Sequence, residues 1–411
     1  MYFNLILGKV GIIIMKILHT ADWHLGVSLG AEKRFEEYDA LLQHICTIIE
    51  NEKIEAVIIA GDVFDTPLPP NRAAEQYYRF LLQAGRAGAR DIIVLGGNHD
   101  SAAYLEAPKE ILKYLSVHVF ACASLQCEDM IITLKNPDGT VAALVGAIPY
   151  LHERDLLTVE GGKGMIEREN TLRSAMLEYY RNMAAALDRR DPNVPHIVTG
   201  HLFACDDHRK NDSWTGTLMS VAAGEFPDSI DYLALGHLHD AHTLKTPHKT
   251  CVRYPGAPVN VSFRELETAK SVTIIDTDDI ANIREIPLVA FQDMRILKGS
   301  KAEIEAELIR LTEEDHSIWC SIENTGEYEP ALAENMYALI KDTQVKIIIC
   351  RNHATNPAVI RRLPEERHLA DLQPVEVFKL MLNENEISGE NADLLLAAFN
   401  EIETAAREDD E

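Results

Sequence analysis

The sequence predicts an α/β protein, and three observations carry this prediction. Five short apolar runs have the β-branched and leucine-rich composition of strands that are buried on both faces. Between them, residues 34–53 and 71–86 place apolar side chains at the spacing of one helix face. A turn rich in histidine, aspartate or asparagine follows each apolar run directly. The five runs are residues 16–20, 56–60, 91–95, 196–199 and 232–235.

Further apolar runs extend this pattern. Their spacing predicts a second sheet packed on the first, and residues 160–188 predict a connection followed by a long helix. We therefore expect a large domain with more than one sheet. The additional predicted strands are residues 117–120, 130–134, 141–148 and 271–276.

The polar turns repeat one kind of side chain at one structural position. In open α/β sheets this position, the carboxyl end of the strands, is where active sites form. The turns supply two carboxylates, one amide oxygen and four imidazoles, a set that suits two divalent metal ions. Such ligands fit manganese, iron or zinc, and without a thiolate nothing favours a structural zinc site. The candidate ligands are Asp22, His24, Asp62, Asn98, His201, His237 and His239.

The five turns, in this order, resemble the calcineurin-like metallophosphoesterase superfamily, whose pattern is D-x-H, G-D, G-N-H-[DE], G-H and G-H-x-H. Within it, residues 19–26, 61–65, 254–258 and 262–265 resemble the bacterial SbcD nuclease subunits, and the resemblance runs from about Met15 to the C-terminus. It implies a four-layer α-β-β-α sandwich with a small α/β cap domain and C-terminal helices that bind a partner.

The resemblance also implies a role for each ligand. Asp62 bridges the two metals, Asp22, His24 and His239 hold one of them, and the other is held by Asn98, His201 and His237. Manganese is the metal that the resemblance favours. Two such metals clamp the attacking and leaving oxygens of an in-line displacement and lower the pKa of a bound water.

His99 is the histidine of these turns that the metals do not need. The resemblance makes it the group that stabilises the phosphorane or protonates the leaving oxygen, with Asp100 orienting its ring. The alternative is that His99 only packs within its turn.

Three classes of function compete at this point. The resemblance implies a metal-dependent DNA nuclease subunit of an SbcCD-type complex, with exonuclease action on double strands and endonuclease action on single strands or hairpins. Its roles would lie in DNA repair, recombination and replication. An alternative is another metallophosphoesterase that acts on nucleotides or phosphoproteins. A non-catalytic scaffold on the same fold is the third class, and the intact ligand set argues against it.

The net charge of −26 is unusual for a DNA enzyme, because a free-standing duplex binder carries a basic stripe. The resemblance supplies a solution, namely an SbcC-like coiled-coil ATPase that itself holds DNA. It also implies a homodimer within a heterotetramer, and we expect the dimer to form through helices near residues 34–50 and 72–86, whose apolar surface exceeds what one sheet face needs.

Cysteine usage and the N-terminus bear on location. The seven cysteines are scattered and form no C-x-x-C, which suits a reducing cytoplasm rather than a disulfide framework. Residues 1–14 are apolar but too short and interrupted to cross a membrane, and they lack the marks of a signal peptide. We expect a cytoplasmic protein, without membrane contact, in which residues 1–14 are a disordered extension or a mis-assigned start.

The domain organisation can be predicted as well. Residues 15–287 form the phosphoesterase domain, and residues 288–350 the cap, with helices at 301–311 and 329–341 and strands at 317–322 and 345–350. The polar residues 351–373 are a linker by composition. Residues 374–411 form a helix-loop-helix that binds the ATPase partner, with Phe378, Met381 and Leu382 in one apolar group. The alternative is that these helices pack back on the cap.

Overall fold

The computed structural model describes residues 15–124, 126–156, 165–206 and 220–353, together with eight residues between Val375 and Phe399. The predictions for residues 1–14, and for the linker beyond His353, lie outside the described residues. The chain forms two compact units that meet in the sequence between Phe291 and Gln292.

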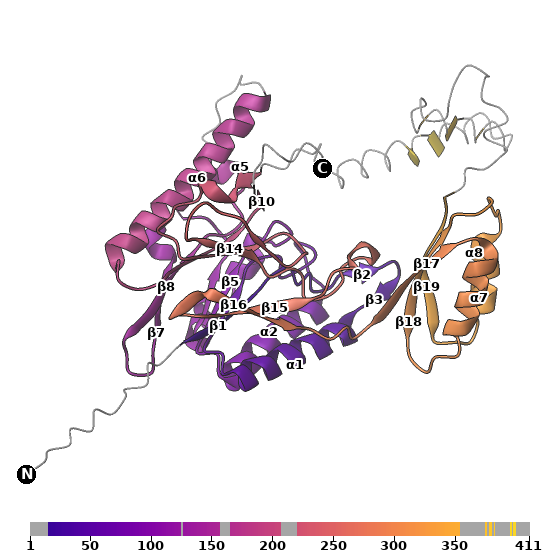
Figure 1. Ribbon diagram of the computed structural model, residues 1–411, viewed down its shortest axis with the longest axis horizontal. Helices are drawn as coiled ribbons and strands as arrows, with labels where there is room; N and C mark the ends of the chain where they lie inside the picture. Colours follow the sequence, from indigo (N-terminus) through magenta and orange to yellow (C-terminus); the bar gives the residue numbers. More distant parts are fainter. Residues whose placement is uncertain are drawn as a thin grey trace, which may run out of the picture. The chain divides into compact units, whose positions relative to one another are not determined.

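Two six-stranded sheets form the first unit (Figure 1). The first has the order β16 (Asp279–Pro287), β15 (Ser271–Asp276), β1 (Lys16–Thr20), β4 (Ala56–Ile59), β5 (Asp91–Leu95) and β6 (Val117–Phe120). The second has the order β13 (His242–Leu244), β14 (Cys251–Tyr254), β12 (Tyr232–Gly236), β9 (His196–His201), β8 (Val141–Ala147) and β7 (Ile131–Lys135).

The five strands that precede the polar turns lie where the sequence predicts them, but they divide between the two sheets. Strands β1, β4 and β5 are parallel neighbours in the first sheet, and β9 and β12 are parallel neighbours in the second. The prediction of a second sheet is wrong for residues 117–120 and 271–276. They belong to the first sheet, where β6 pairs with β5 and β15 pairs with β1, because strand pairing is decided by contacts far apart in sequence.

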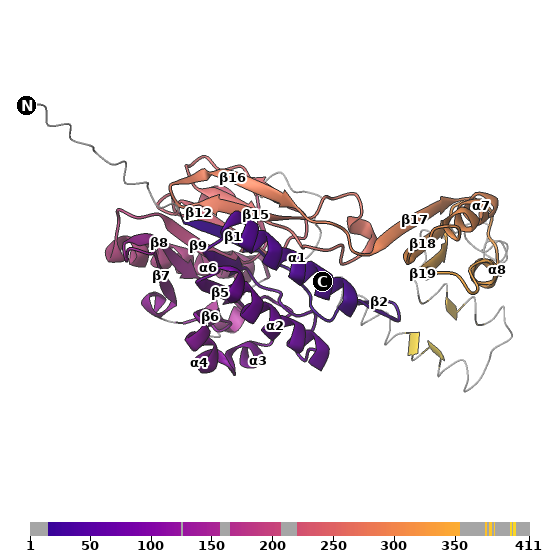
Figure 2. The same cartoon turned by 90° about the horizontal axis from the view of Figure 1, so that it is seen from below.

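Four layers follow from the positions of the apolar side chains. Helices α1 (Phe35–Glu52) and α2 (Asn71–Ala87) pack on the outer face of the first sheet, with Trp23 and Phe80 among the buried residues of that layer. A second cluster fills the space between the sheets, where Ile58, Val145 and Ile197 are buried. Helix α6 (Met165–Arg190) covers the second sheet (Figure 2). The expected α-β-β-α sandwich is thus confirmed.

Shorter elements connect these layers. They are β2 (Ser28–Leu29), β3 (Glu32–Lys33), α3 (Ala102–Glu106), α4 (Lys109–Leu112), η1 (Lys113–Leu115), η2 (Cys127–Met130), α5 (Glu153–Leu156), β10 (Ala204–Cys205), β11 (Val221–Ala222), η4 (Ala223–Glu225) and η5 (Phe263–Glu265).

The second unit contains a three-stranded parallel sheet with two helices. The order is β17 (Asp293–Gly299), β18 (Ile318–Asn324) and β19 (Val345–Asn352), and the connections are α7 (Lys301–Leu311) and α8 (Leu332–Leu339). Strand β17 is absent from the prediction, and β19 continues two residues into the predicted linker. The helices bury Leu308 and Met336 against Ile322, so this unit has a small core of its own.

The described part of the C-terminal region is helical at all eight residues. The rings of Phe378 and Phe399 are stacked with centroids 4.3 Å apart, and Leu382 is buried. Phe378 of the predicted apolar group therefore packs on the second segment through Phe399.

Candidate metal centre

Four of the predicted ligands occupy backbone conformations that L-residues rarely adopt. The φ angles are 54° at Asp22, 48° at His24, 48° at Asp62 and 107° at His237. Each such conformation costs on the order of 1–3 kcal/mol, and persists only where surrounding structure enforces it. The backbone at these turns is therefore shaped for the placement of side chains rather than for its own stability.

The first predicted group of ligands converges. The ligand atoms of Asp22, His24 and His239 all lie within 4.8 Å of one another. The Nε2 atoms of His24 and His239 are 3.1 Å apart, which suits two imidazoles bound to one ion with metal–nitrogen bonds of about 2.0–2.1 Å.

The second group converges on an amide oxygen. Oδ1 of Asn98 lies 3.1 Å from Nε2 of His201 and 3.1 Å from Nδ1 of His237. His201 is buried, whereas Asn98 is exposed, so this group reaches from the interior of the sandwich to its surface.

Asp62 lies between the two groups, as a bridging ligand must. Its Oδ2 atom is 3.7 Å from Nε2 of His24 and 3.3 Å from Nε2 of His201. Its other oxygen accepts a hydrogen bond from the His99 amide at 3.0 Å. A Cβ atom on Gly97 would collide with this carboxylate, which explains the glycine in the third turn.

The donor set fits two divalent cations on the evidence of its own atoms. Oδ2 of Asp22 is buried without a hydrogen-bond partner among the described residues, and an unpaired buried carboxylate oxygen is costly unless a cation binds it. Burial raises the pKa of Asp22. Burial also acts to raise the pKa of Asp62, but the nearby His201 and His24 outweigh it and lower that pKa. Burial opposes a charge on His201, yet Asp62 and Asp22 raise its pKa to about 9.

Residues outside the predicted set hold the ligands in place. Glu265 accepts a hydrogen bond from Nδ1 of His239 at 3.0 Å, and Lys270 contacts the same carboxylate at 2.7 Å. Nδ1 of His201 donates to the carbonyl of Ala60 at 2.8 Å. In both cases the bond fixes which ring nitrogen is free to bind a metal. In the sequence, Glu265 belongs to the motif of residues 262–265, but that motif did not indicate a role for it.

The surroundings of His99 correct one expectation. Its Nδ1 atom lies 2.9 Å from the carbonyl of Asp65, so this carbonyl, rather than Asp100, orients the ring. The Asp100 carboxylate accepts hydrogen bonds from the backbone amides of Val63, Phe64 and Gly97, at 2.9–3.0 Å. Asp100 therefore ties the second turn to the third, and burial and the Asp62 charge raise its pKa to about 6.

Comparisons with known proteins show which families the chain resembles. A family model described as calcineurin-like phosphoesterase matches residues 15–241, and one described as type 5 capsule protein repressor C-terminal domain matches residues 290–386. The SbcD subunit of the nuclease SbcCD from Escherichia coli strain K12 is 32% identical over 378 residues, which cover 90% of this chain and 92% of that protein.

Two further relatives carry the same name. The protein of Bacillus subtilis strain 168 is 31% identical over 64% of this chain and 66% of its own length. The protein of Rhodobacter capsulatus is 33% identical over 67% of this chain and 69% of its own length.

Replacing Glu265 with alanine is expected to weaken metal binding about 10–100-fold, because His239 loses the carboxylate that orients its ring. The measurement is a calorimetric titration of metal-free protein with manganese. Glu267→Ala is the matched control, since Glu267 is exposed and, in the described part of the chain, has no bonded partner. Equal affinity of the two variants would show that Glu265 does not position the ligand.

Metal binding is expected to release at least one proton at pH 7.5. With a pKa of about 9, His201 is protonated in the metal-free protein at that pH, and a metal needs its neutral form. The affinity should therefore rise by about tenfold per pH unit for each proton displaced, and this gain should end above pH 9. Titrations in two buffers of different ionisation enthalpy measure the proton count, and a heat independent of buffer would contradict it.

Proposed function

Because this chain belongs to the calcineurin-like phosphoesterases and, within them, to the SbcD nuclease subunits, we propose that its seven converging ligands hold two divalent metal ions. The chain is a metal-dependent nuclease. The observation that carries the proposal is the position of Asp62 between His24 and His201, with the remaining ligands on the two sides. We propose manganese as the metal in the cell.

When bound, the two ions supply Lewis acidity to a phosphodiester and lower the pKa of a water. The chain contributes the proton transfer. Because a carbonyl oxygen only accepts, the bond to Asp65 requires a proton on Nδ1 of His99 and leaves Nε2 free. His99 is exposed, and its ring centroid lies 4.8 Å from that of His24, so a substrate at the metals is within its reach. In its charged form, His99 donates from Nε2 to the phosphorane or the leaving oxygen.

We propose that the substrate is DNA, cut from duplex ends as an exonuclease and in single strands or hairpins as an endonuclease, in repair, recombination and replication. Support comes from the name that the relatives share and from a match that covers 90% of the chain. The competing proposal, a phosphoesterase of nucleotides or phosphoproteins, would need the first unit alone. The second unit and the match of residues 290–386 favour the nuclease.

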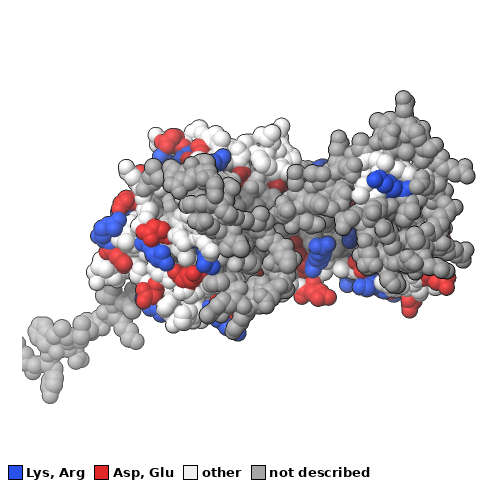
Figure 3. Space-filling model, turned by 90° about the horizontal axis from the view of Figure 1, so that it is seen from above, with Lys and Arg blue, Asp and Glu red and all other residues white. Residues whose placement is uncertain are grey.

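The net charge of −26 makes a partner part of this proposal. On the face drawn in Figure 3, basic and acidic side chains are interspersed over the described surface, so no broad basic face for duplex DNA is seen there. We propose that an SbcC-like coiled-coil ATPase binds the DNA, with two copies of this chain as a homodimer in a heterotetramer. Among the described residues, no helix has the length and apolarity to cross a membrane, and we propose a cytoplasmic location.

The expected excess of apolar surface, which was the reason to place the dimer surface on helices α1 and α2, is not observed. The apolar side chains of α1 are mostly buried against the first sheet, and Leu82 is the large hydrophobic residue of α2 that is substantially exposed, at 46%. The helices near residues 34–50 and 72–86 thus carry little excess apolar surface. Their role as the dimer surface remains a proposal that rests on the family.

The domain limits given above, with cap residues 288–350 and partner-binding residues 374–411, likewise remain proposals. The stacked Phe378 and Phe399 rings support a helix pair that docks as one body, and Leu395, 41% exposed, is available to a partner.

The nuclease proposal is tested by two substitutions. Asp62→Asn should abolish cleavage of plasmid and hairpin DNA with manganese, since both ions lose a shared anionic ligand. His99→Ala should retain the metal content and lower turnover by about 10²–10⁴-fold, the range for a lost general acid. His248→Ala, an exposed histidine of the β13–β14 turn, is the control. Near-normal DNA cleavage by His99→Ala would contradict its role, and cleavage of p-nitrophenyl phosphate esters but not DNA would favour the competing proposal.

The docking proposal predicts that a chain ending at Leu372 keeps hydrolysis of small phosphodiesters but no longer co-purifies with the ATPase. The physical reason is that short helices are marginal alone and gain stability from a partner surface. Complex formation that survives the truncation would show that the partner binds elsewhere.

A further inference from the structure

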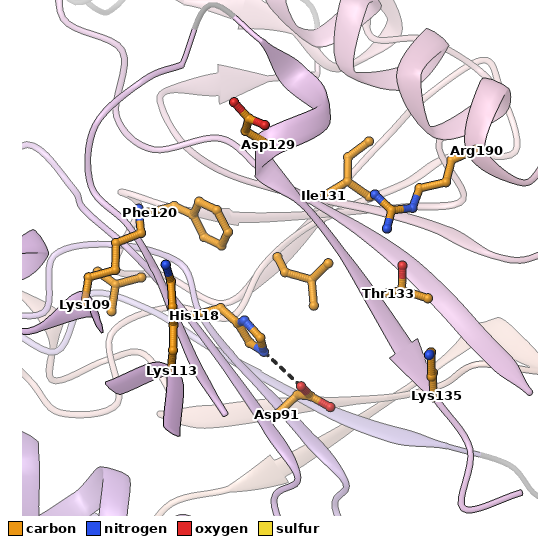
Figure 4. Close-up of a pocket in the computed structure, with 12 residues that line it drawn as sticks. Asp91, Lys109, Lys113, His118, Phe120, Asp129, Ile131, Thr133, Lys135 and Arg190 are labelled. Carbon is orange, nitrogen blue, oxygen red and sulfur yellow. Dashed lines mark hydrogen bonds and ion pairs between the residues drawn. The ribbon is translucent and has the colours of Figure 1, made fainter. Parts of the chain in front are cut away.

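A groove runs along the open side of the sandwich, and none of its lining residues is a predicted metal ligand. Strand β6 is the edge of the first sheet and β7 the edge of the second, and a cavity of about 770 Å³ opens between them (Figure 4). Its apolar lining comes from both strands, with Val119 and Phe120 on one side and Ile131 and Ile132 on the other.

Basic side chains line both walls of this groove. Lys109 and Lys113 come from the helical segment α4–η1, and Arg190 and Lys135 from the end of α6 and the end of β7. Figure 4 shows Lys113 and Arg190 on the two sides of the apolar residues. Lys109 pairs with Glu106 of α3 and Lys113 with Glu110 of α4, whereas Lys135 and Arg190 are exposed and have no ion pair in the described part of the chain.

Basic side chains outnumber carboxylates among the residues that line the groove. The cavity is lined by four basic side chains and two carboxylates, and one of these, Asp91, is engaged by Nε2 of His118 at 2.9 Å. Glu106 and Glu110 pair with Lys109 and Lys113, so Lys135 and Arg190 are the lining cations that remain for an anionic ligand, in a chain of net charge −26. Edge strands are often protected from pairing by lysine, but that purpose does not need an arginine from a helix or cations on both walls.

One end of the groove reaches Phe120, at the carboxyl end of β6, and β6 pairs with the strand that leads to Asn98. The amide of Gly96, two residues before Asn98, donates to the carbonyl of Phe120 at 3.0 Å. A second cavity of about 550 Å³ shares Lys109 and Phe120 with the first and continues past Cys122. The loop that carries His99 also leads directly into α3 and then α4. The groove and the third ligand turn are therefore built on neighbouring strands of the first sheet.

We propose that this groove binds one strand of nucleic acid that extends from the metal centre. The inference rests on the proposed nuclease function and adds a second contact region to it. Phosphates of a strand would lie against the four cations, and bases would contact the apolar lining and the ring of Phe120, as in other single-strand sites. The cavity volume is that of a pocket for small organic groups, so it admits bases and phosphates of a single strand but not a duplex.

The test is binding of a fluorescein-labelled oligothymidylate to the full-length, metal-free protein, followed by fluorescence anisotropy at several salt concentrations. Lys135→Glu and Arg190→Glu should each weaken binding, and the double variant should weaken it by about tenfold or more. The slope of log affinity against log salt should fall by about 0.7 for each lost phosphate contact. Hydrolysis of bis(p-nitrophenyl) phosphate with manganese should not change, because neither residue belongs to the metal centre.

Lys245→Glu is the matched control for Lys135→Glu. Lys245 is exposed beside β13, the opposite edge strand of the same sheet, and its substitution changes the net charge equally. Equal losses at Lys245 and Lys135, unchanged binding by the double variant, no binding by the wild-type chain, or a loss confined to duplex DNA would each overturn the inference. The binding measurement uses no metal, so it does not depend on cleavage. If the nuclease proposal is wrong, the wild-type protein will instead fail to cleave phosphodiesters in the separate activity assay.

Discussion

The structure depends on two carboxylates buried where the two sheets meet. Asp22 and Asp62 are 0% and 2% exposed, and an ionised carboxylate without a partner in such a place destabilises a fold by several kcal/mol. Protonated histidines can compensate this charge in the metal-free protein, as the raised pKa of His201 indicates. Divalent cations compensate it better, since they also satisfy the free oxygen of Asp22 and the close nitrogens of His24 and His239. Metal binding and folding stability are therefore linked at this edge.

Neither sheet could build this site alone. The turns after β1, β4 and β5 supply Asp22, His24, Asp62 and Asn98, and the last residue of β9 and the turn after β12 supply the remaining histidines. The apolar layer between the sheets fixes the distance between these two sets, because buried residues such as Ile58 and Ile197 leave little freedom for sliding. The hydrogen bond from the His237 amide to Asp22, 2.8 Å long, ties the two edges directly.

Site residues could be predicted from the sequence where their position depends only on the strand that precedes them. Each ligand lies within or a few residues beyond the carboxyl end of a buried strand, so its position at that edge could be predicted without tertiary contacts. The pairing of residues 117–120 with β5 could not, since an apolar run of four residues fits the edge of either sheet. Glu265 is 26 residues from His239, and the motif that contains it does not indicate that its carboxylate contacts that histidine. Asp100 follows His99 directly, yet its hydrogen bonds go to the backbone of two turns, which only the folded loops bring together.

An acidic chain can act on a polyanion if the electrostatic attraction between its basic groups and the phosphates acts only over short distances. At physiological ionic strength charges are screened over about 8 Å, so a strand that touches a basic wall feels its neighbours more than the distant acids. The groove between β6 and β7 and the cationic metals then act locally, and the surrounding acids oppose binding of nucleic acid at other places. An acidic chain of this kind has low general affinity for DNA. In the proposed arrangement, its local basic contacts guide a strand that a partner has delivered. The proposed division of labour between a DNA-binding ATPase and an acidic nuclease is consistent with this balance of charge.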